Sequence, residues 1–305
     1  MKIIIAGGTG FIGSALIQKL AGKNEIVVVS RDPMKASKQF GAMSGLHFVG
    51  WDDPVPLIRD TIANSNAIIN LSGAPIAAKR WSENYKKKII TSRVESIDRL
   101  VQLIEKAKLK LDVVIQASGK DYYGMSEDNT FTESSPVGTG FMADVAKQWE
   151  SAAKRFDNST TRLVILRTGM VLDRSGGALP PIASPIKFFL GGPIGSGKQW
   201  VSWIHLEDQI RAITHLLQTP TSSGAYNLTA PHPITNSELI KTISNVLGRP
   251  FWLPTPGFAV RTLFGEMGDE LILKGNKVLP EKLLADKFNF SYETIEPAIK
   301  QIYKP

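Results

Sequence analysis

A glycine-rich stretch near the start of the chain has the spacing needed to bind the pyrophosphate of a dinucleotide. It reads Gly-Gly-Thr-Gly-Phe-Ile-Gly over residues 7–13, between an apolar strand pattern and an amphipathic helix pattern. The first glycine pair allows a tight turn, Gly10 lets a pyrophosphate approach the backbone, and Gly13 permits close helix–strand packing. A turn without a ligand is the alternative, but the strand–turn–helix context and the free N–H groups at the helix start favour a cofactor. The residues predicted to contact the cofactor here are Gly7, Gly10, Phe11, Ile12 and Gly13.

The residues after the second apolar run select the kind of dinucleotide. The chain reads Val-Ser-Arg-Asp over residues 29–32. An acidic side chain at this place accepts hydrogen bonds from a ribose 2′-hydroxyl, whereas a basic one accommodates a 2′-phosphate. Arg31 can grip that phosphate with two parallel hydrogen bonds, and Ser30 can donate another. We therefore predict NADP as the cofactor; in the alternative, Arg31 is a solvated turn residue and Asp32 binds the ribose.

Further residues follow the other expected strands. Because the carboxyl ends of parallel strands meet at one edge of a sheet, side chains just after each strand face a common crevice. We expect several of them to line the cofactor, together with two residues from later helices. The residues so assigned are Trp51, Asp52, Leu71, Ser72, Gly73, Ser92 and Lys147.

Apolar runs and helical patterns alternate through the first two thirds of the chain and would position these residues. This alternation predicts an α/β fold with a Rossmann-like, doubly wound parallel sheet. We expect an NADP-binding domain over residues 1–229, with a lid-like loop at about 176–200 where Gly and Pro cluster, and a smaller C-terminal α/β substrate-side domain over residues 230–305. The expected strands are residues 2–6, 25–29, 46–49, 67–71, 113–117, 163–166 and 225–228, and the expected helices lie near residues 11–20, 55–63, 83–106, 142–156, 205–217 and 236–247.

Short motifs along essentially the whole chain resemble those of the atypical extended short-chain dehydrogenases/reductases. More narrowly, the chain is similar to an "epimerase family protein" subgroup, related to nucleotide-sugar epimerases, that has an extra C-terminal domain. The resemblance implies an NAD(P)-binding extended fold, a small-molecule substrate between the two domains and, by analogy, a homodimer formed through helices like those at 83–106 and 142–156. The matching motifs include the loop at 7–13, Asn70-Leu71-Ser72-Gly73-Ala74, Lys79-Arg80-Trp81, Ser92-Arg93, Tyr122-Tyr123-Gly124, Trp149-Glu150, Arg167-Thr168-Gly169 and Ser202-Trp203-Ile204-His205.

The catalytic helix departs from the pattern of that superfamily. Active members use a tyrosine as acid/base and a lysine four residues later, on the same helix face, that lowers the tyrosine pKa. If Lys147 is the lysine here, the tyrosine position holds Ala143; if the helix is aligned on Glu150, the pair becomes Met142 and Ala146. No alignment supplies the tyrosine, so the usual relay is absent. Lys147 then either binds the cofactor ribose or is a surface lysine.

Other residues offer replacements for the relay. We expect Ser118, just past the fifth strand, to polarise a substrate oxygen, and Tyr123, Asp121 or an ordered water to handle the proton. Packing in the wall of the crevice is the alternative role for the tyrosines. Substrate contacts are assigned to a further set of residues near the crevice, some of which suit an anionic or planar group. They are Lys79, Arg80, Trp81, Tyr122, Trp203 and His205.

Composition and charge argue against several other classes of protein. The chain has 36 basic and 28 acidic residues, a formal net charge of +8, but no basic stripe with interleaved aromatics that would indicate nucleic acid. No apolar stretch approaches the roughly 20 residues that span a membrane, and the N-terminal apolar run is too short for a signal peptide. We therefore expect a cytoplasmic protein. Without cysteines, and with four unclustered histidines, no metal site is expected.

Two functional hypotheses follow from these residues. The first is an NADP-dependent, epimerase-like oxidoreductase that acts on a small carbonyl or alcohol substrate, sugar-type or anionic. The second is an NADP(H)-binding sensor or scaffold without efficient chemistry, which the missing tyrosine favours. A resemblance of residues 192–198 to a phosphate-binding P-loop is rejected, because Gln199 stands where a magnesium-binding Ser or Thr is needed.

Overall fold

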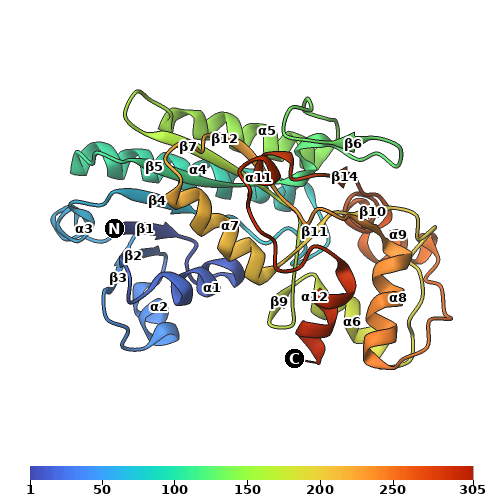
Figure 1. Ribbon diagram of the computed structural model, residues 1–305. Helices are drawn as coiled ribbons and strands as arrows, with labels where there is room; N and C mark the ends of the chain where they lie inside the picture. Colours follow the sequence, from blue (N-terminus) through green and yellow to red (C-terminus); the bar gives the residue numbers. More distant parts are fainter. Residues whose placement is uncertain (305) are drawn as a thin grey trace.

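β1 (Lys2–Ala6) lies near the middle of a seven-stranded sheet in the computed structural model, which describes residues 1–304 (Figure 1). The strand order is β3-β2-β1-β4-β5-β7-β12, and each neighbouring pair is parallel. The carboxyl ends of these strands therefore meet at one edge, where open sheets of this kind bind their ligands. The other six strands are β2 (Glu25–Ser30), β3 (Leu46–Gly50), β4 (Ala67–Asn70), β5 (Val113–Gly119), β7 (Arg162–Thr168) and β12 (Gly224–Leu228).

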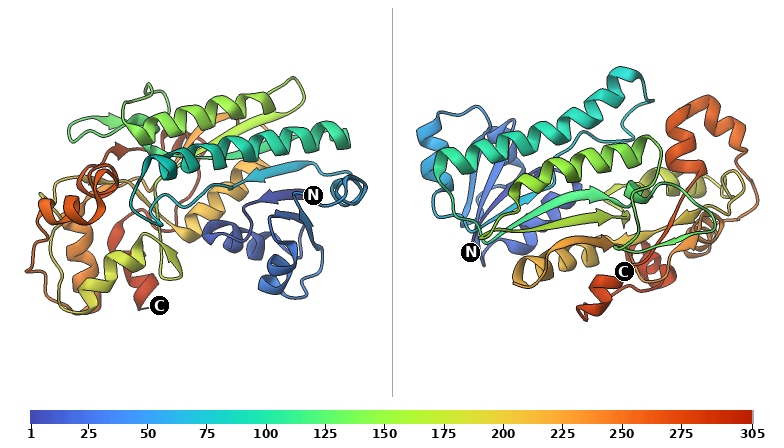
Figure 2. Two further views of the ribbon diagram at one scale, coloured as in Figure 1. Left: turned by 180° about the vertical axis from the view of Figure 1, so that it is seen from behind. Right: turned by 90° about the horizontal axis from the view of Figure 1, so that it is seen from above.

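Helices cover both faces of the sheet (Figure 2). Side chains alternate along β1, so that Ile3 and Ile5 join the core under α1 and α7, whereas Ile4 and Ala6 join the core under α3, α4 and α5. Strands that are buried on both faces read as continuous apolar runs, which explains their strong signal in the sequence. The helices are α1 (Phe11–Leu20), α2 (Pro33–Phe40) and α7 (Leu206–Gln218) on one face, and α3 (Val55–Ile62), α4 (Glu83–Ala107) and α5 (Phe141–Ala153) on the other.

A smaller unit lies beyond the carboxyl edge of the sheet (Figure 1). Its core combines residues between Met170 and Trp203 with residues between Ala230 and Tyr303. Helix α8 (Asn236–Leu247) begins at a capping box between Thr235 and Glu238 and ends at the left-handed Gly248. The other elements of this region are β8 (Met170–Asp173), β9 (Gly176–Gly177), α6 (Leu179–Lys187), β10 (Trp200–Val201), β11 (Trp203–His205), β13 (Ile234–Thr235), α9 (Gly257–Phe264), α10 (Glu266–Gly268), the π-helical turn η3 (Asp269–Leu273), β14 (Lys277–Val278), α11 (Glu281–Ala285) and α12 (Ile295–Tyr303). β14 pairs with β6 (Thr130–Phe131). The remaining elements are the 3₁₀ turns η1 (Lys120–Tyr123) and η2 (Lys154–Phe156).

The expected Rossmann-like α/β fold is confirmed, but one local prediction is wrong. The stretch at about 176–200 was expected to be a loop, whereas α6 occupies Leu179–Lys187 and packs against α8. Pro180 and Pro181 lie in the first helical turn, where the missing N–H groups have no helical acceptor to lose. Prolines in the sequence therefore marked the start of a helix here, and only Pro185 lies inside it.

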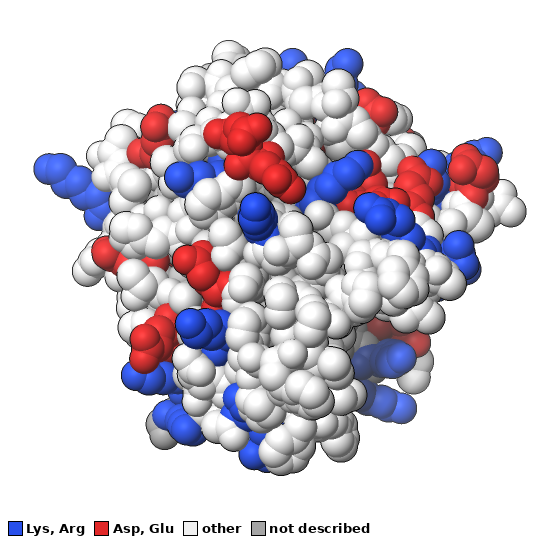
Figure 3. Space-filling model, turned by 90° about the vertical axis from the view of Figure 1, so that its right-hand side faces the viewer, with Lys and Arg blue, Asp and Glu red and all other residues white. Residues whose placement is uncertain are grey.

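The surface of the smaller unit is partly apolar. Figure 3 views the molecule from the side of α8 and α9 and shows few charged side chains over the lower centre of this face. Phe188, Trp252, Phe258 and Leu263 are each more than half exposed. Separately, no helix within residues 1–304 combines the length and the apolar character that crossing a bilayer requires.

Candidate active site

The glycine loop between β1 and α1 has the close contacts that a pyrophosphate cradle requires. Gly7 has a φ of +78°, and a Cβ there would lie 2.6 Å from the Leu71 carbonyl carbon. A Cβ at Gly13 would lie 2.3 Å from the Gly7 carbonyl oxygen. At Gly10 a Cβ would meet only that same oxygen, at 3.3 Å, so the space beside Gly10 is otherwise open. The loop is thus folded tightly on itself and open where a phosphate would approach.

The first turn of α1 offers free donors to an anion. Ser14 donates the first helical hydrogen bond, to the Gly10 carbonyl. The N–H groups of Phe11, Ile12 and Gly13 have no acceptor among residues 1–304, and the turn contains no acidic residue. Unpaired N–H groups at the positive end of a helix bind phosphate. This arrangement fits a dinucleotide pyrophosphate.

The contacts of the residues after β2 distinguish between two predicted modes of ribose binding, one through Arg31 and one through Asp32. The Asp32 carboxylate caps α2 by accepting from the Lys35 N–H at 2.9 Å, so it already has a structural role. The Ser30 hydroxyl accepts from the Asp32 N–H at 3.2 Å, and the Trp51 N–H donates to the Ser30 carbonyl. Arg31 is exposed and has no ionic partner in the described part of the chain. Because Arg31 has no ionic partner in the described chain and the Asp32 carboxylate already caps α2, these residues favour binding of a ribose 2′-phosphate over a 2′-hydroxyl.

The loop after β4 lies against the glycine loop. Leu71 donates its N–H to the Ala6 carbonyl at 2.9 Å, which continues the pairing of β4 with β1. The Ser72 N–H is held by the Asn70 side chain at 3.1 Å. Together with the Gly7 contact, these bonds fix the segment that the sequence assigned to the cofactor.

Two residues of α4 support this loop from behind. Ser92 accepts from the Ala74 N–H at 3.0 Å, and Arg93 donates to the Ala74 carbonyl at 3.2 Å. A Cβ at Gly73 would lie 3.1 Å from the Arg93 guanidinium carbon. The guanidinium stacks on Trp149, and its burial lowers the pKa of Arg93 to about 10. The sequence assigned Ser92 to the cofactor; its hydroxyl instead holds the loop.

Asp52 and Lys147 point elsewhere. Asp52 forms an ion pair with Arg99 of α4 at 3.2 Å, and the same arginine lies over the Trp51 ring. Lys147 is exposed on α5 and has no ionic or hydrogen-bond partner within residues 1–304. The structure gives neither side chain a contact with the glycine loop, and their cofactor roles stay predictions.

A buried polar network occupies the carboxyl ends of β5, β7 and β12. Arg167 donates to both Glu150 oxygens at 2.9 and 2.8 Å, and Ser118 donates to Glu150 at 2.8 Å. The Tyr123 hydroxyl donates to Asn227 at 2.6 Å and accepts from Arg167 at 2.9 Å. Burial raises the pKa of Tyr123 to about 12. Both hydroxyls are committed to interior partners, so the geometry does not support Tyr123 as proton donor and gives Ser118 a positioning role.

The η1 turn carries polar groups nearer the surface. The Tyr122 ring lies 3.5 Å under the Arg167 guanidinium, and its hydroxyl has no partner in the described chain. Lys120 binds Asp121 at 2.8 Å and Asn276 at 3.0 Å, which ties the turn to the smaller unit. Lys120 directly follows β5 but was not singled out in the sequence, although the rule for strand ends applies to it.

Both candidate positions of the missing tyrosine, Met142 and Ala143, are buried and apolar. Met142 is buried in a cluster with Trp81, Tyr85 and Met267, the last contributed by α10 of the smaller unit. Ala146 is also buried. With either alignment an apolar side chain stands in place of the tyrosine, and no tyrosine–lysine pair lies on this helix.

Three substrate candidates from the loop before α4 have structural partners. Lys79 lies over the Tyr85 ring, and Arg80 donates to the Thr262 carbonyl of α9 at 3.4 Å. Trp81 is buried, and its indole N–H donates to a carbonyl of the same loop. Arg80, and Trp81 through its cluster with Met267, attach the smaller unit to the loop, and an anion clamp stays a prediction for Lys79 and Arg80.

The other two candidates are interior. Trp203 is fully buried, and its indole N–H donates to the His232 carbonyl. His205 accepts from the Glu207 N–H and shares a hydrogen bond with Gln301 at 2.9 Å. The geometry does not support substrate contacts for Trp203 or His205, because neither has a polar group left free.

One carboxylate of the network is incompletely paired. Glu133 Oε1 accepts from the backbone N–H groups of Asn227 at 3.0 Å and Lys282 at 3.2 Å, whereas Oε2 has no hydrogen-bond partner among the described residues. Burial raises the pKa of Glu133 above its usual range. At pH values between the unfolded and the folded pKa, the folded state therefore holds a proton there that the unfolded state has released.

We expect Glu133→Gln to change the pH dependence of stability. Between the unfolded and the raised folded pKa, the native protein binds more protons, so wild-type stability falls as pH rises through this window. The glutamine variant keeps the Oε1 acceptor and lacks that loss. Denaturant unfolding from about pH 4 to about pH 8 should show the variant gaining on the wild type as pH rises. If the stabilities of the wild type and the variant changed in parallel with pH, the raised pKa assigned to Glu133 would be contradicted.

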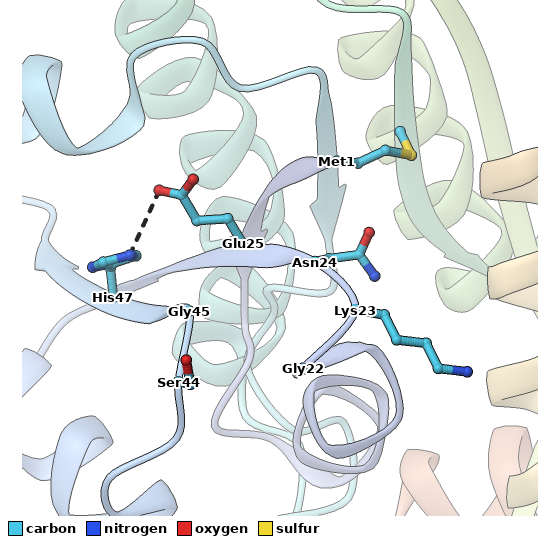
Figure 4. A pocket seen from close by; sticks show the side chains of 8 residues that line it. All are labelled: Met1, Gly22, Lys23, Asn24, Glu25, Ser44, Gly45 and His47. Atoms are coloured by element: carbon cyan, nitrogen blue, oxygen red, sulfur yellow. Dashed lines mark ion pairs between the residues drawn. The ribbon is translucent and has the colours of Figure 1, made fainter.

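A hollow at the opposite edge of the sheet is not part of this site. Met1, Lys23, Ser44 and a Glu25–His47 pair line it at the amino ends of the strands (Figure 4). Ligand sites of doubly wound sheets lie at the carboxyl edge. Within residues 1–304 no group of three acidic or histidine side chains is arranged to hold a metal ion.

Comparison with known proteins identifies the family. Residues 3–229 match the model of the NAD-dependent epimerase/dehydratase family, and residues 255–302 match DUF1731, a domain of unknown function. The "Epimerase family protein SDR39U1" of Homo sapiens is 35% identical over 306 residues, covering 99% of both chains. An Arabidopsis thaliana homologue described as chloroplastic is 37% identical, covering 99% of this chain and 86% of that protein.

Solved structures agree with this result. The crystal structure of human SDR39U1 (isoform 2) with NADPH matches with a TM-score of 0.89 and 34% identity, over 100% of this chain and 99% of that one. A UDP-glucuronic acid 4-epimerase from Bacillus cereus, at 16% identity and a TM-score of 0.76 over 99% of this chain and 98% of that one, shares the fold. The resemblance drawn from the motifs is confirmed. The chain belongs to the NAD-dependent epimerase/dehydratase family.

Proposed function

We propose that this protein binds NADP(H) and is an epimerase-like oxidoreductase acting on a small carbonyl or alcohol substrate, sugar-type or anionic. The observation that carries the proposal is the relative crystallised with NADPH, which is 34% identical and has a TM-score of 0.89 over the whole chain. The glycine cradle and the free Arg31 supply the matching chemistry in this chain.

The residues divide into holding and shielding roles. The bound cofactor supplies hydride transfer at the nicotinamide ring. The first turn of α1 holds its pyrophosphate, and Arg31 with Ser30 holds its 2′-phosphate. Met142 and its apolar cluster exclude water beside the reacting centre. Tyr122 and Asp121 are the residues of the η1 turn that we assign to the substrate, whereas Ser118 and Tyr123 make interior hydrogen bonds to Glu150 and Asn227.

Turnover with a panel of small carbonyl compounds tests the proposal. The panel should include nucleotide sugars, free keto-sugars and 2-keto acids, with NADPH consumption as the readout. We expect consumption in the wild type and none in a variant that no longer binds the cofactor. Tight NADPH binding without consumption on any member would favour the sensor, which the apolar replacement of the tyrosine supports as a second candidate.

We expect Arg31→Ala to weaken NADPH binding roughly 10- to 150-fold, since a hydrogen bond to a charged group contributes about 1.5–3 kcal/mol. NADH has no 2′-phosphate, so its affinity should change little. Calorimetric titration of both nucleotides checks this. Arg59→Ala, another exposed arginine of the same domain, is the control and should leave both affinities unchanged. Equal losses for the two nucleotides would contradict the role of Arg31.

The domain organisation, the oligomeric state and the cellular location belong to the same proposal. We propose two domains, residues 1–229 and 230–305, with the substrate between them. A homodimer and a cytoplasmic location stay predictions. Within the first domain, the segment Met170–Trp203 shares a core with the smaller unit, so it forms part of the contact between the two domains.

A further inference from the structure

The smaller unit places one carboxylate against the helix that lacks its tyrosine. Glu270 lies in the π-helical turn η3, directly after α10. π-Helical turns are rare and frequently occur at functional sites. Met267 of the same segment packs on Met142, and Lys86 of α4 binds Glu266 at 3.0 Å. The segment is therefore held firmly over the start of α5.

The contact of Glu270 with α5 is close. A Cβ at Gly140, the residue before α5, would lie 3.2 and 3.3 Å from the two Glu270 oxygens. The backbone N–H of Met142 interacts with the same carboxylate. A side chain at position 140 would push the carboxylate back by a few tenths of an ångström, and the φ of +109° there also favours glycine. The carboxylate thus lies at the first turn of α5, beside Met142, which stands at the tyrosine position when the helix is aligned on Glu150.

The charges around Glu270 come from three elements. Asp121 of η1 and Glu266 of α10 disfavour the carboxylate form, whereas Lys274 and the Met142 N–H favour it. Lys120 neutralises Asp121 at 2.8 Å. Burial is the largest influence, and the pKa of Glu270 is raised above its usual range. A half-buried carboxyl of this kind can keep a proton closer to neutral pH, as a general acid requires.

We propose that Glu270, supplied by the C-terminal unit, gives and takes the proton that a tyrosine of α5 handles elsewhere in the superfamily. In the reducing direction the C=O π pair moves to oxygen, hydride from NADPH forms the new C–H bond, and the Glu270 proton forms the O–H bond. NADP⁺, the alcohol and the Glu270 carboxylate remain, and water returns the proton. The assignment rests on the proposed oxidoreductase function.

The test compares Glu270→Gln with Glu293→Gln, an exposed carboxylate elsewhere in the C-terminal unit. With a carbonyl substrate from the panel, kcat should fall about 100-fold or more in E270Q and stay within about twofold in E293Q. NADPH affinity should be unchanged in both. In the wild type, reduction should fall as pH rises through the Glu270 pKa, and this limb should vanish in E270Q. Glu270→Asp should recover part of the rate, because it keeps an acid.

A second readout needs no turnover. Carbon-13 NMR of glutamate-labelled protein should show a carboxyl that titrates above the usual glutamate range and is missing from E270Q. If E270Q folds and turns over at the wild-type rate, or if Glu270 titrates in the usual glutamate range, the assignment of Glu270 is overturned while the proposed function still stands. Absence of turnover in the wild type on every substrate would overturn the proposed function and remove the assignment with it.

Discussion

Arg167→Met should lower the free energy of unfolding by about 3–5 kcal/mol, the usual cost of removing one partner from a buried ion pair. Arg167 and Glu150 are each less than a tenth exposed and are joined by two short hydrogen bonds. Without the guanidinium, Glu150 is left as an uncompensated buried charge, and the Tyr123 hydroxyl loses a donor. Denaturant unfolding followed by circular dichroism measures the loss.

The double variant Glu150→Met/Arg167→Met is the matched control. Replacing both members of a buried pair by apolar residues of similar volume is often nearly neutral. We therefore expect the double variant to recover most of the stability lost in the single one. A double variant as unstable as Arg167→Met would mean that the pair is not the source of the effect.

Gly13→Ala should weaken NADPH binding by about 1–3 kcal/mol, or roughly 5- to 150-fold, because overpacking shifts the surrounding backbone. The added Cβ would lie 2.3 Å from the Gly7 carbonyl oxygen, a backbone atom that cannot move without reshaping the cradle. Calorimetry with NADPH measures the loss, and thermal unfolding checks the fold.

Gly257→Ala provides the comparison for this change. Its added Cβ would meet its nearest neighbour at 3.7 Å, an ordinary contact. We expect NADPH affinity to be unchanged there. Similar losses in the two variants would show that the effect is a general loss of stability rather than damage to the cradle.

The sequence predicted the sheet well because its signal is local. Ile3, Ile4 and Ile5 are all fully buried, and such runs are typical of a parallel strand covered on both faces. The kind of cofactor could be predicted for the same reason, because a glycine loop and the residue after the next strand are defined by a few neighbouring positions. The sequence does not reveal helix α6, because clustered prolines are typical of loops, whereas here Pro180 and Pro181 occupy its first turn.

The catalytic side depends on contacts between distant parts of the chain. Tyr123 follows β5 as expected, but Asn227, a hundred residues later, takes its hydroxyl. Trp203 follows a motif of the superfamily, yet the core of the smaller unit encloses it. No pattern in the neighbouring sequence marks Glu270, because its proposed role depends on the contact between η3 and the first turn of α5. A missing residue is visible in a sequence, whereas its replacement from another unit is not.

The measurement that tests the central claim most directly is calorimetric titration of the wild-type protein with NADPH and with NADH under the same conditions. With Arg31 free and Asp32 committed to capping α2, we predict binding of one NADPH per chain and an affinity for NADPH roughly 10- to 150-fold higher than for NADH. Equal affinities, tighter binding of NADH, or no binding of either nucleotide would contradict the account.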